Sequence, residues 1–188
     1  MSNRTANYAA FYVAEPFSES NLGAFSTPDF LYYNQLRAWK SADNSFPFID
    51  AHAKTYSVRD GSEWETLKRR LHDRLNVSKN IVLFLSANTK NSRALREEIE
   101  YGINSRGLPV IVIYPDFKKK SDICCTTGIK KQIRDLWDKL PVFRDNMDKV
   151  ATLHVPYKKE LIKSALEDPD LRVQTMVDTN AYFFTIDN

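Results

Sequence analysis

Three glutamates lie close together between residues 97 and 100, and their spacing decides which of them is placed for chemistry. They fall within residues 92–105, which read as an α-helix whose buried stripe is Leu95, Ile99, Gly102 and Ile103. At ~100° per residue, Glu97 points away from that stripe and Glu100 lies on its outer flank, while Glu98 sits at its shoulder, about 85° from the centre. Glu98 is therefore the acid nearest the buried side.

A half-buried carboxylate at the end of a sheet has several chemical uses. It can stabilise an oxocarbenium-like centre, hold ribose hydroxyls, or act as a nucleophile at an anomeric carbon. The structural alternative is a surface glutamate that pairs with Arg106 or another nearby base. The residues alone leave the two interpretations of Glu98 equally weighted.

Polar residues also follow the strands that are expected beside this helix. Residues 80–86 are nearly all apolar, as in a central parallel strand, and the polar side chains Ser86, Asn88 and Thr89 stand at its end. Asp50 closes a second apolar run. Ligands bind beyond the carboxyl ends of parallel strands, so these groups could converge on a polyhydroxylated ligand. The alternative is that they only cap turns.

Several other chemistries lack their sequence signatures. The chain has no glycine-rich phosphate loop and no Gly-x-Ser-x-Gly elbow, which argues against a dehydrogenase, a kinase or a hydrolase of that type. The three histidines are scattered, and no metal site is expected. Cys124 and Cys125 are adjacent, a poor arrangement for a structural disulfide, so a reduced cytoplasmic protein is predicted.

Short apolar runs alternate with amphipathic stretches along the chain. Strands are expected at residues 8–13, 46–50, 80–86, 108–114 and 150–155. A helix begins at Thr27-Pro28-Asp29, and another follows the capping-box spacing of residues 62–65. Because parallel neighbours need helical crossovers, the order predicts an α/β fold with three layers, a central parallel five-stranded sheet and helices on both faces.

The length and composition favour one domain. The chain has 188 residues, 43% of them hydrophobic, so a single core spanning residues 1–188 is expected. Residues 167–188 form a C-terminal extension. Its Tyr182-Phe183-Phe184 run is too apolar for a free tail and is expected to pack on the domain or pair at a sheet edge, the alternative being an exposed patch for a partner.

The distribution of charged residues indicates which classes of partner the chain could bind. The net charge is +3, but the basic residues are spread over separate short clusters, which is typical of solvated helix faces and unlike the dense stripe of a nucleic-acid binder. No apolar run approaches the ~20 residues that span a bilayer. We therefore expect neither a nucleic-acid nor a membrane partner.

The order of elements and the residues of 80–100 resemble TIR-like domains, especially those of Thoeris antiphage defence. The resemblance spans about residues 8–155. In TIR domains a serine precedes the functional glutamate by six positions, and here Ser92 stands six before Glu98. This register selects Glu98 independently of the helical phase. A shorter match, Arg59-Asp60-Gly61, resembles the Arg-Asp of the loop after the second strand.

The resemblance implies an enzyme that cleaves the nicotinamide–ribose bond of NAD, with NAD as the substrate and no separate cofactor. Glu98 would engage the ribose and stabilise its cationic transition state. The residues expected to contact the substrate are Phe11, Tyr12, Asp50, Ser86, Asn88 and Ser92. In Thoeris-like systems a phage component triggers production of a cyclic or modified ADP-ribose, which activates a separate effector. A homo-oligomer is plausible, because a neighbouring subunit often completes such a site.

Two other functions stay open at this point. One is a non-enzymatic TIR-like adaptor, in which the same helices bind protein partners and Glu98 is a surface acid. The other is a nucleoside deoxyribosyltransferase-like enzyme, which also places a glutamate on the helix after a buried strand. The residues from Glu98 to Val110 are compatible with the transferase.

Overall fold

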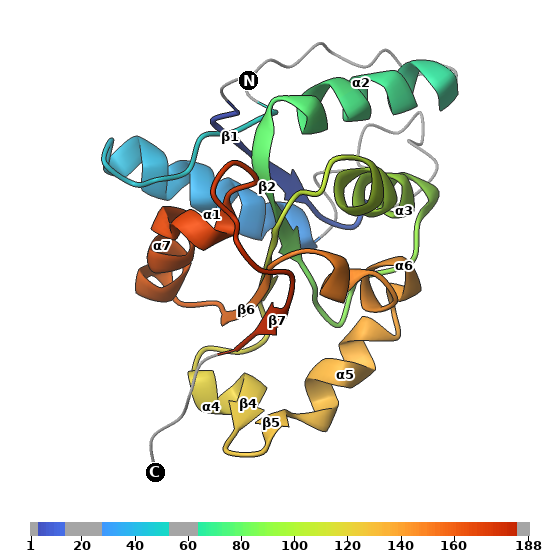
Figure 1. Ribbon diagram of the computed structural model, residues 1–188. Helices are drawn as coiled ribbons and strands as arrows, with labels where there is room; N and C mark the ends of the chain where they lie inside the picture. Colours follow the sequence, from blue (N-terminus) through green and yellow to red (C-terminus); the bar gives the residue numbers. More distant parts are fainter. Residues whose placement is uncertain (1–3, 14–27, 53–63, 184–188) are drawn as a thin grey trace.

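The computed structural model describes residues 4–13, 28–52 and 64–183 and shows a parallel sheet between two layers of helices (Figure 1). The five strands follow the order β1-β2-β3-β6-β7, and every pairing between them is parallel. Their bounds are β1 Ala6–Ala10, β2 Ser78–Phe84, β3 Val110–Tyr114, β6 Thr152–Pro156 and β7 Ala181–Tyr182. This arrangement confirms the predicted α/β fold.

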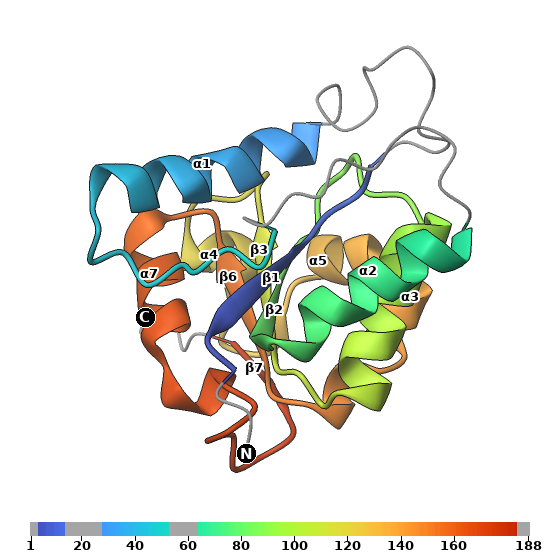
Figure 2. The ribbon, with the colours of Figure 1, turned by 90° about the horizontal axis from the view of Figure 1, so that it is seen from above.

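Helices cover both faces of the sheet (Figure 2). One face carries α1 (Pro28–Ala42) and α7 (Lys159–Glu167). The other face carries α2 (Trp64–Asn76), α3 (Arg93–Glu100), α5 (Lys131–Trp137) and α6 (Pro141–Arg144). A small projection follows β3 and consists of α4 (Lys120–Ile123) and the antiparallel pair β4 (Cys124–Cys125) and β5 (Gly128–Ile129).

The buried strands supply two separate hydrophobic cores by alternation. In β1, Tyr8 and Ala10 belong to the core under α2 and α3, whereas Ala9 belongs to the core under α1 and α7. In β2, Ile81 and Leu83 alternate in the same way with their neighbours. Successive side chains point to opposite faces of a strand, so a sheet that is covered on both sides needs apolar residues at nearly every position.

The strand predicted at residues 46–50 is wrong. This segment makes a single parallel bridge, Asn7 to Asp50, beside β1. The side-chain oxygen of Asn7 accepts from the backbone N–H of Ile49 at 2.8 Å, which replaces a regular ladder bond, and Pro47 has no N–H to donate. The apolar character of the run instead reflects Phe46 and Phe48, which are buried in the core under α1.

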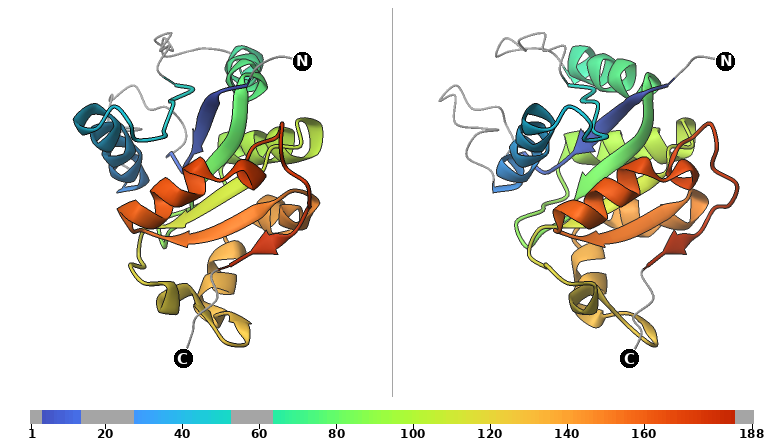
Figure 3. Two further views of the ribbon diagram at one scale, coloured as in Figure 1. Left: turned by 60° about the vertical axis from the view of Figure 1, so that its left-hand side comes forward. Right: turned by 90° about the vertical axis from the view of Figure 1, so that its left-hand side faces the viewer.

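The fifth strand comes from the C-terminal extension. In β7, Ala181 pairs with Thr152 and Tyr182 with Leu153, so β7 lies beside β6 at the end of the sheet opposite β1 (Figure 3). Further back, the backbone N–H of Val173 donates to the carbonyl of Lys79 at 2.9 Å. This edge pairing is the one that the apolar run suggested, while the domain division at residue 167 stays a prediction.

The helix predicted at 92–105 changes its winding partway along. Residues Arg93–Glu100 are α-helical, and Tyr101–Ser105 continue as a π-helix, η1. Gly102 lies at this junction, where an added Cβ would collide with the side chain of Ile81 on β2. Glycine therefore lets the helix approach the sheet closely. Two short 3-10 helices complete the described elements, η2 (Met147–Lys149) and η3 (Pro169–Leu171).

Candidate active site

Glu98 lies on the inner side of α3, facing β1. The helix starts at a cap in which the Ser92 hydroxyl accepts a hydrogen bond from the N–H of Leu95 at 3.3 Å. Leu95 and Ile99 are buried in the core, and their positions fix the rotation of the helix. Glu98 is consequently half-buried next to the side chain of Tyr8.

The surroundings of Glu98 change its acidity. Burial raises the pKa of this carboxyl from 4.5 to about 8, although the nearby Tyr8 hydroxyl and the positive charge of Arg74 lower it in part. Near neutral pH both protonation states are then populated. A carboxyl group in that condition can exchange a proton with a substrate or hold a hydroxyl group, which is why shifted acids mark active sites.

Tyr8 is the partner of Glu98 on β1. Its buried hydroxyl has no hydrogen bond of ideal geometry among the described residues, but it lies close enough to Glu98 for the two side chains to shift each other's pKa through a hydrogen bond. Burial and the adjacent Glu98 raise the pKa of this phenol, so it keeps its proton. A buried hydroxyl needs a hydrogen-bonding partner, and Glu98 is the titratable group beside it.

Glu97, the neighbouring acid, has a different environment. The helical phase predicts that it points away from the core, yet α2 covers it, and its carboxylate lies 2.8 Å from His72 Nε2 and 3.3 Å from Lys68 Nζ. Partial burial alone would raise the pKa of the Glu97 carboxyl, but these partners outweigh it, so the pKa of Glu97 is lowered. Among the described residues Glu98 forms no such ion pair, with Arg106 or any other base.

Asp50 stands in a second group of side chains, on the α1 side of β1. The Tyr33 hydroxyl donates to Asp50 Oδ2 at 2.6 Å, and the backbone N–H of His52 donates to Oδ1 at 2.9 Å. Phe11 stacks on Tyr33 with ring centroids 5.2 Å apart. The structure therefore brings together two predicted site residues, Phe11 and Asp50, through Tyr33.

Tyr33 did not emerge from the sequence as a site residue. The apolar spacing of this helix predicts Tyr32, Leu36 and Trp39 as its buried face. In the structure Asp29, Tyr33 and Leu36 are buried, while Tyr32 and Trp39 pack against the same core and are partly buried. The signal available was the spacing of three between Tyr33 and Leu36, which is as compatible with one helix face as the spacing of four from Tyr32.

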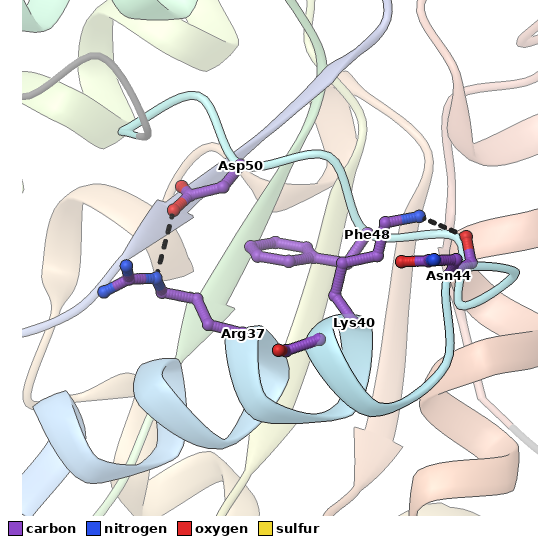
Figure 4. A pocket seen from close by; sticks show the side chains of 6 residues that line it. Arg37, Lys40, Asn44, Phe48 and Asp50 are labelled. Atoms are coloured by element: carbon purple, nitrogen blue, oxygen red, sulfur yellow. Dashed lines mark hydrogen bonds and ion pairs between the residues drawn. The ribbon is translucent and has the colours of Figure 1, made fainter.

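A shallow pocket of about 300 Å³ opens between α1 and the segment that ends at Asp50. Figure 4 shows Arg37 pointing toward Asp50, with Nε 3.7 Å from Oδ2, and Lys40 turned toward Asn44. Lys40 Nζ donates to the carbonyl oxygens of Asn44 and Phe46 at 2.7 and 2.9 Å. Arg37 and Lys40 therefore both interact with groups of the protein. Glu98, under the other face of the sheet, does not line this pocket.

The Glu98 group and the Asp50 group meet at His52. The imidazole ring lies 4.8 Å from the ring of Tyr8 and 5.8 Å from that of Tyr33, so it bridges the two faces around the outer edge of β1. Its Nε2 is 2.9 Å from the carbonyl oxygen of Ala9, and its Nδ1 is 3.3 Å from Arg74 Nη1. Neither His52 nor Arg74 stood out as a site residue in the sequence.

The remaining predicted contact residues have other partners in the structure. Ser86 Oγ donates to Asp29 Oδ1 at 2.7 Å and accepts from the N–H of Asn88 at 3.1 Å, which is a turn-capping arrangement. Tyr12 packs against the core, with Lys90 Nζ 5.8 Å from its ring centre. Substrate contacts by Tyr12, Ser86, Asn88 and Ser92 stay predictions.

Some sequence signals fall beyond the described residues. The Arg59-Asp60-Gly61 match, the first two residues of the 62–65 capping box and Phe184 all lie outside them. Within the described ranges, no cluster of three His, Cys, Asp or Glu side chains is arranged to hold a metal ion. Neither Cys124 nor Cys125 forms a disulfide within the described part of the chain. No helix in the described part combines the length and apolar character that a membrane crossing requires.

A comparison with known protein families gives a match to this chain. The family model described as "Thoeris protein ThsB, TIR-like domain" matches residues 8–120 of this chain. The matched range runs from Tyr8 on β1 to the start of α4 and contains Glu98, Asp50, His52 and Arg74. Both groups of side chains described above therefore lie within the part of the chain that resembles that family.

Proposed function

This chain belongs to the ThsB TIR-like domain family of Thoeris defence, and on that premise we propose that it is an enzyme acting on NAD. The observation that carries the proposal is Glu98, a half-buried carboxyl whose pKa is raised to about 8 and which faces the buried hydroxyl of Tyr8. Helical phase and the spacing from Ser92 select the same residue.

The proposed reaction breaks the bond between nicotinamide and ribose. The bonding electron pair leaves with the nicotinamide nitrogen, which becomes neutral, and positive charge develops on the ribose ring. An ionised Glu98 stabilises that charge and accepts a hydrogen bond from a ribose hydroxyl. Attack at the anomeric carbon by water, which gives up a proton to Glu98 or to solvent, yields ADP-ribose, and attack by a nucleophile of the same molecule yields a cyclised form.

Substrate binding itself favours the required charge state of Glu98. The nicotinamide ring of NAD is positively charged, and an opposite charge within a few ångströms lowers the pKa of a carboxyl. Free Glu98, with its pKa of about 8, is mainly protonated at pH 7. The bound cation therefore ionises the catalytic residue when it is needed, and the neutral acid costs less to bury when the site is empty.

The biological role proposed here is signal production. A phage component triggers the reaction, and the resulting cyclic or modified ADP-ribose activates a separate effector protein. The family membership supports this role, because the matched domain is that of a Thoeris protein.

The decisive experiment compares Glu98→Gln with Glu100→Gln in cells that carry the neighbouring defence genes and are challenged with phage. Glu100 is exposed on the same helix and serves as the matched control. We expect Glu98→Gln to abolish protection and nicotinamide release, measured by survival and mass spectrometry, while Glu100→Gln retains both. Equal protection by the wild type and Glu98→Gln would contradict a catalytic role.

A second incubation separates the chemical classes. Purified protein is given NAD or a deoxynucleoside, with Glu98→Gln in parallel. Exchange of the base on the deoxynucleoside would assign the chain to the transferase class instead. Protection in cells without any Glu98-dependent chemistry on either compound would indicate an adaptor.

A further inference from the structure

The hydrogen bonds of His52 fix its protonation state. A carbonyl oxygen only accepts, so the 2.9 Å contact with the carbonyl of Ala9 places the hydrogen on Nε2. Nδ1 of the neutral ring is then an acceptor, and Arg74 Nη1 donates to it at 3.3 Å. Burial and the charge of Arg74 lower the pKa of His52 to about 4, in agreement with a neutral ring.

Arg74 acts on both faces of the sheet. It lies half-buried in the last turn of α2, and its positive charge lowers the pKa of Glu98 and Tyr8 on one face and of Tyr33 on the other. Among the described residues Arg74 forms no ion pair with Glu98 or Asp50. Its one side-chain hydrogen bond there goes to His52.

The charged groups around Glu98 leave Arg74 as the cation that influences it. The elements packed on α3 are β1, α2, α6 and η1, and with the segment at His52 they carry the titratable or charged groups Tyr8, Asp50, His52, Glu65, Lys68, Arg69, Arg70, His72, Asp73, Arg74, Tyr101, Arg106, Arg144 and Asp145. Among these, Arg74 is the cation whose charge shifts the pKa of Glu98. Lys68 and His72 are engaged by Glu97. Arg144 is engaged by Asp138 and Asp145. His52 is neutral, as its hydrogen bonds require.

We propose that Arg74 is a positioning residue of this site: held by His52, whose ring contacts both Tyr8 and Tyr33, it places one positive charge at the outer edge of β1 and so joins the Glu98 side and the Asp50 side into a single site. This inference rests on the proposed function, in which Glu98 contacts the substrate. Arg74 itself acts through Glu98 and His52. A purely structural role is the alternative, because a cation in the last turn also favours a helix C-terminus.

A titration of Glu98 separates the two roles without requiring activity. In the full chain labelled with ¹³C at the glutamate carboxyl, NMR follows the wild type, Arg74→Gln, Arg74→Lys and His52→Phe, with Glu98→Gln assigning the signal. Lys68→Gln is the matched control, because Lys68 is another α2 cation near α3 that pairs with Glu97 instead.

The expected result is specific to Arg74. Arg74→Gln raises the pKa of Glu98 by about one unit, Arg74→Lys raises it less, and Lys68→Gln leaves it unchanged. His52→Phe keeps a ring against Tyr8 but removes the acceptor for Arg74, so it gives a smaller rise in the same direction. An equal shift in Arg74→Gln and Lys68→Gln, or no shift in Arg74→Gln, overturns the inference. Arg74→Lys still decides the question if Arg74→Gln does not fold.

The activity arm distinguishes this inference from the proposed function. The rate of nicotinamide release is expected to rise with pH as Glu98 ionises. In Arg74→Gln this rise should occur at a higher pH, by the same shift in pKa that the titration shows. Wild-type activity in Arg74→Gln, with this rise at an unchanged pH, overturns the positioning role alone. Absence of Glu98-dependent nicotinamide release overturns the proposed function, and the positioning role with it.

Discussion

Two adjacent glutamates on α3 behave differently because of the side chains that cover them. Glu97 meets Lys68 and His72 from α2 and remains an ordinary ionised acid. Glu98, one residue on, has no such ion pair, and burial raises its pKa to about 8 although Tyr8 and Arg74 lower it in part. A step of ~100° around the helix separates a structural ion pair from a candidate catalytic group.

The raised pKa of Glu98 predicts a pH-dependent effect on stability. The folded chain binds this proton up to about pH 8, but the unfolded chain releases it above 4.5. Between those values the folded state holds more protons, so the contribution of Glu98 to the free energy of unfolding falls as the pH rises. Glu98→Gln, which cannot ionise, is expected to be more stable than the wild type at pH 8 by about 1–3 kcal/mol.

Thermal unfolding at pH 5 and pH 8 measures this difference. The gain in Tm for Glu98→Gln should be clear at pH 8 and small at pH 5, while the exposed control Glu100→Gln shows little change at either pH. A gain that is independent of pH would show that Glu98 is not buried in its charged form. The measurement does not depend on whether the protein is an enzyme.

At the scale of elements, the close contact between the α3–η1 helix and β2 depends on Gly102. A Cβ at this position would collide with the Ile81 side chain. Gly102→Ala therefore pushes the helix that carries Glu98 away from the sheet. Overpacking of this kind costs about 1–3 kcal/mol, more than the helix propensity that alanine gains.

Chemical denaturation of Gly102→Ala tests this contact, with Ser105→Ala on the exposed side of η1 as the control. We expect a lower denaturation midpoint for Gly102→Ala and almost none of this loss for Ser105→Ala. A stabilised Gly102→Ala would show that Ile81 moves aside without cost.

Comparing the helices and strands with the sequence shows which sequence patterns predicted structure correctly. The 3.6-residue period placed Leu95, Ile99, Gly102 and Ile103 on the buried side of the helix, where the structure has them. The apolar run at 46–50 failed as a strand predictor, because burial under α1 produces the same composition as burial in a sheet. Local pattern reports burial, and only the pairing partner decides whether a buried run becomes a strand.

At the scale of the whole molecule, Glu98 and Asp50 lie on opposite sides of β1 and share His52. Local sequence pattern selected the two acids: Glu98 by helical phase and its spacing from Ser92, and Asp50 as the last residue of an apolar run. His52 and Arg74 could not be found in that way, because their contact joins residues 22 apart across a helix that has to dock first. The pattern within one segment carries no information about such a contact.

The C-terminal extension leads to a prediction about assembly. β7 covers the outer edge of β6, and a chain that ends at Val177 would leave β6 with unpaired backbone groups. This truncation is expected to self-associate with rising concentration, whereas a chain that ends at Phe183 and keeps β7 should not. Sedimentation at several concentrations makes the comparison. Identical behaviour of the two chains would mean that β7 does not protect the edge.

The opposite end of the sheet is protected by side chains and by a segment that is not a strand. On the outer side of β1, the backbone groups of Asn7 bond to Ile49 and Ala51, and the imidazole of His52 occupies the carbonyl of Ala9. An incoming strand finds those positions already taken. A substitution at His52 thus exposes a docking edge for other chains at the same time as it frees Arg74, so a loss of signalling in such a variant has two separable origins, a disturbed active site and aggregation.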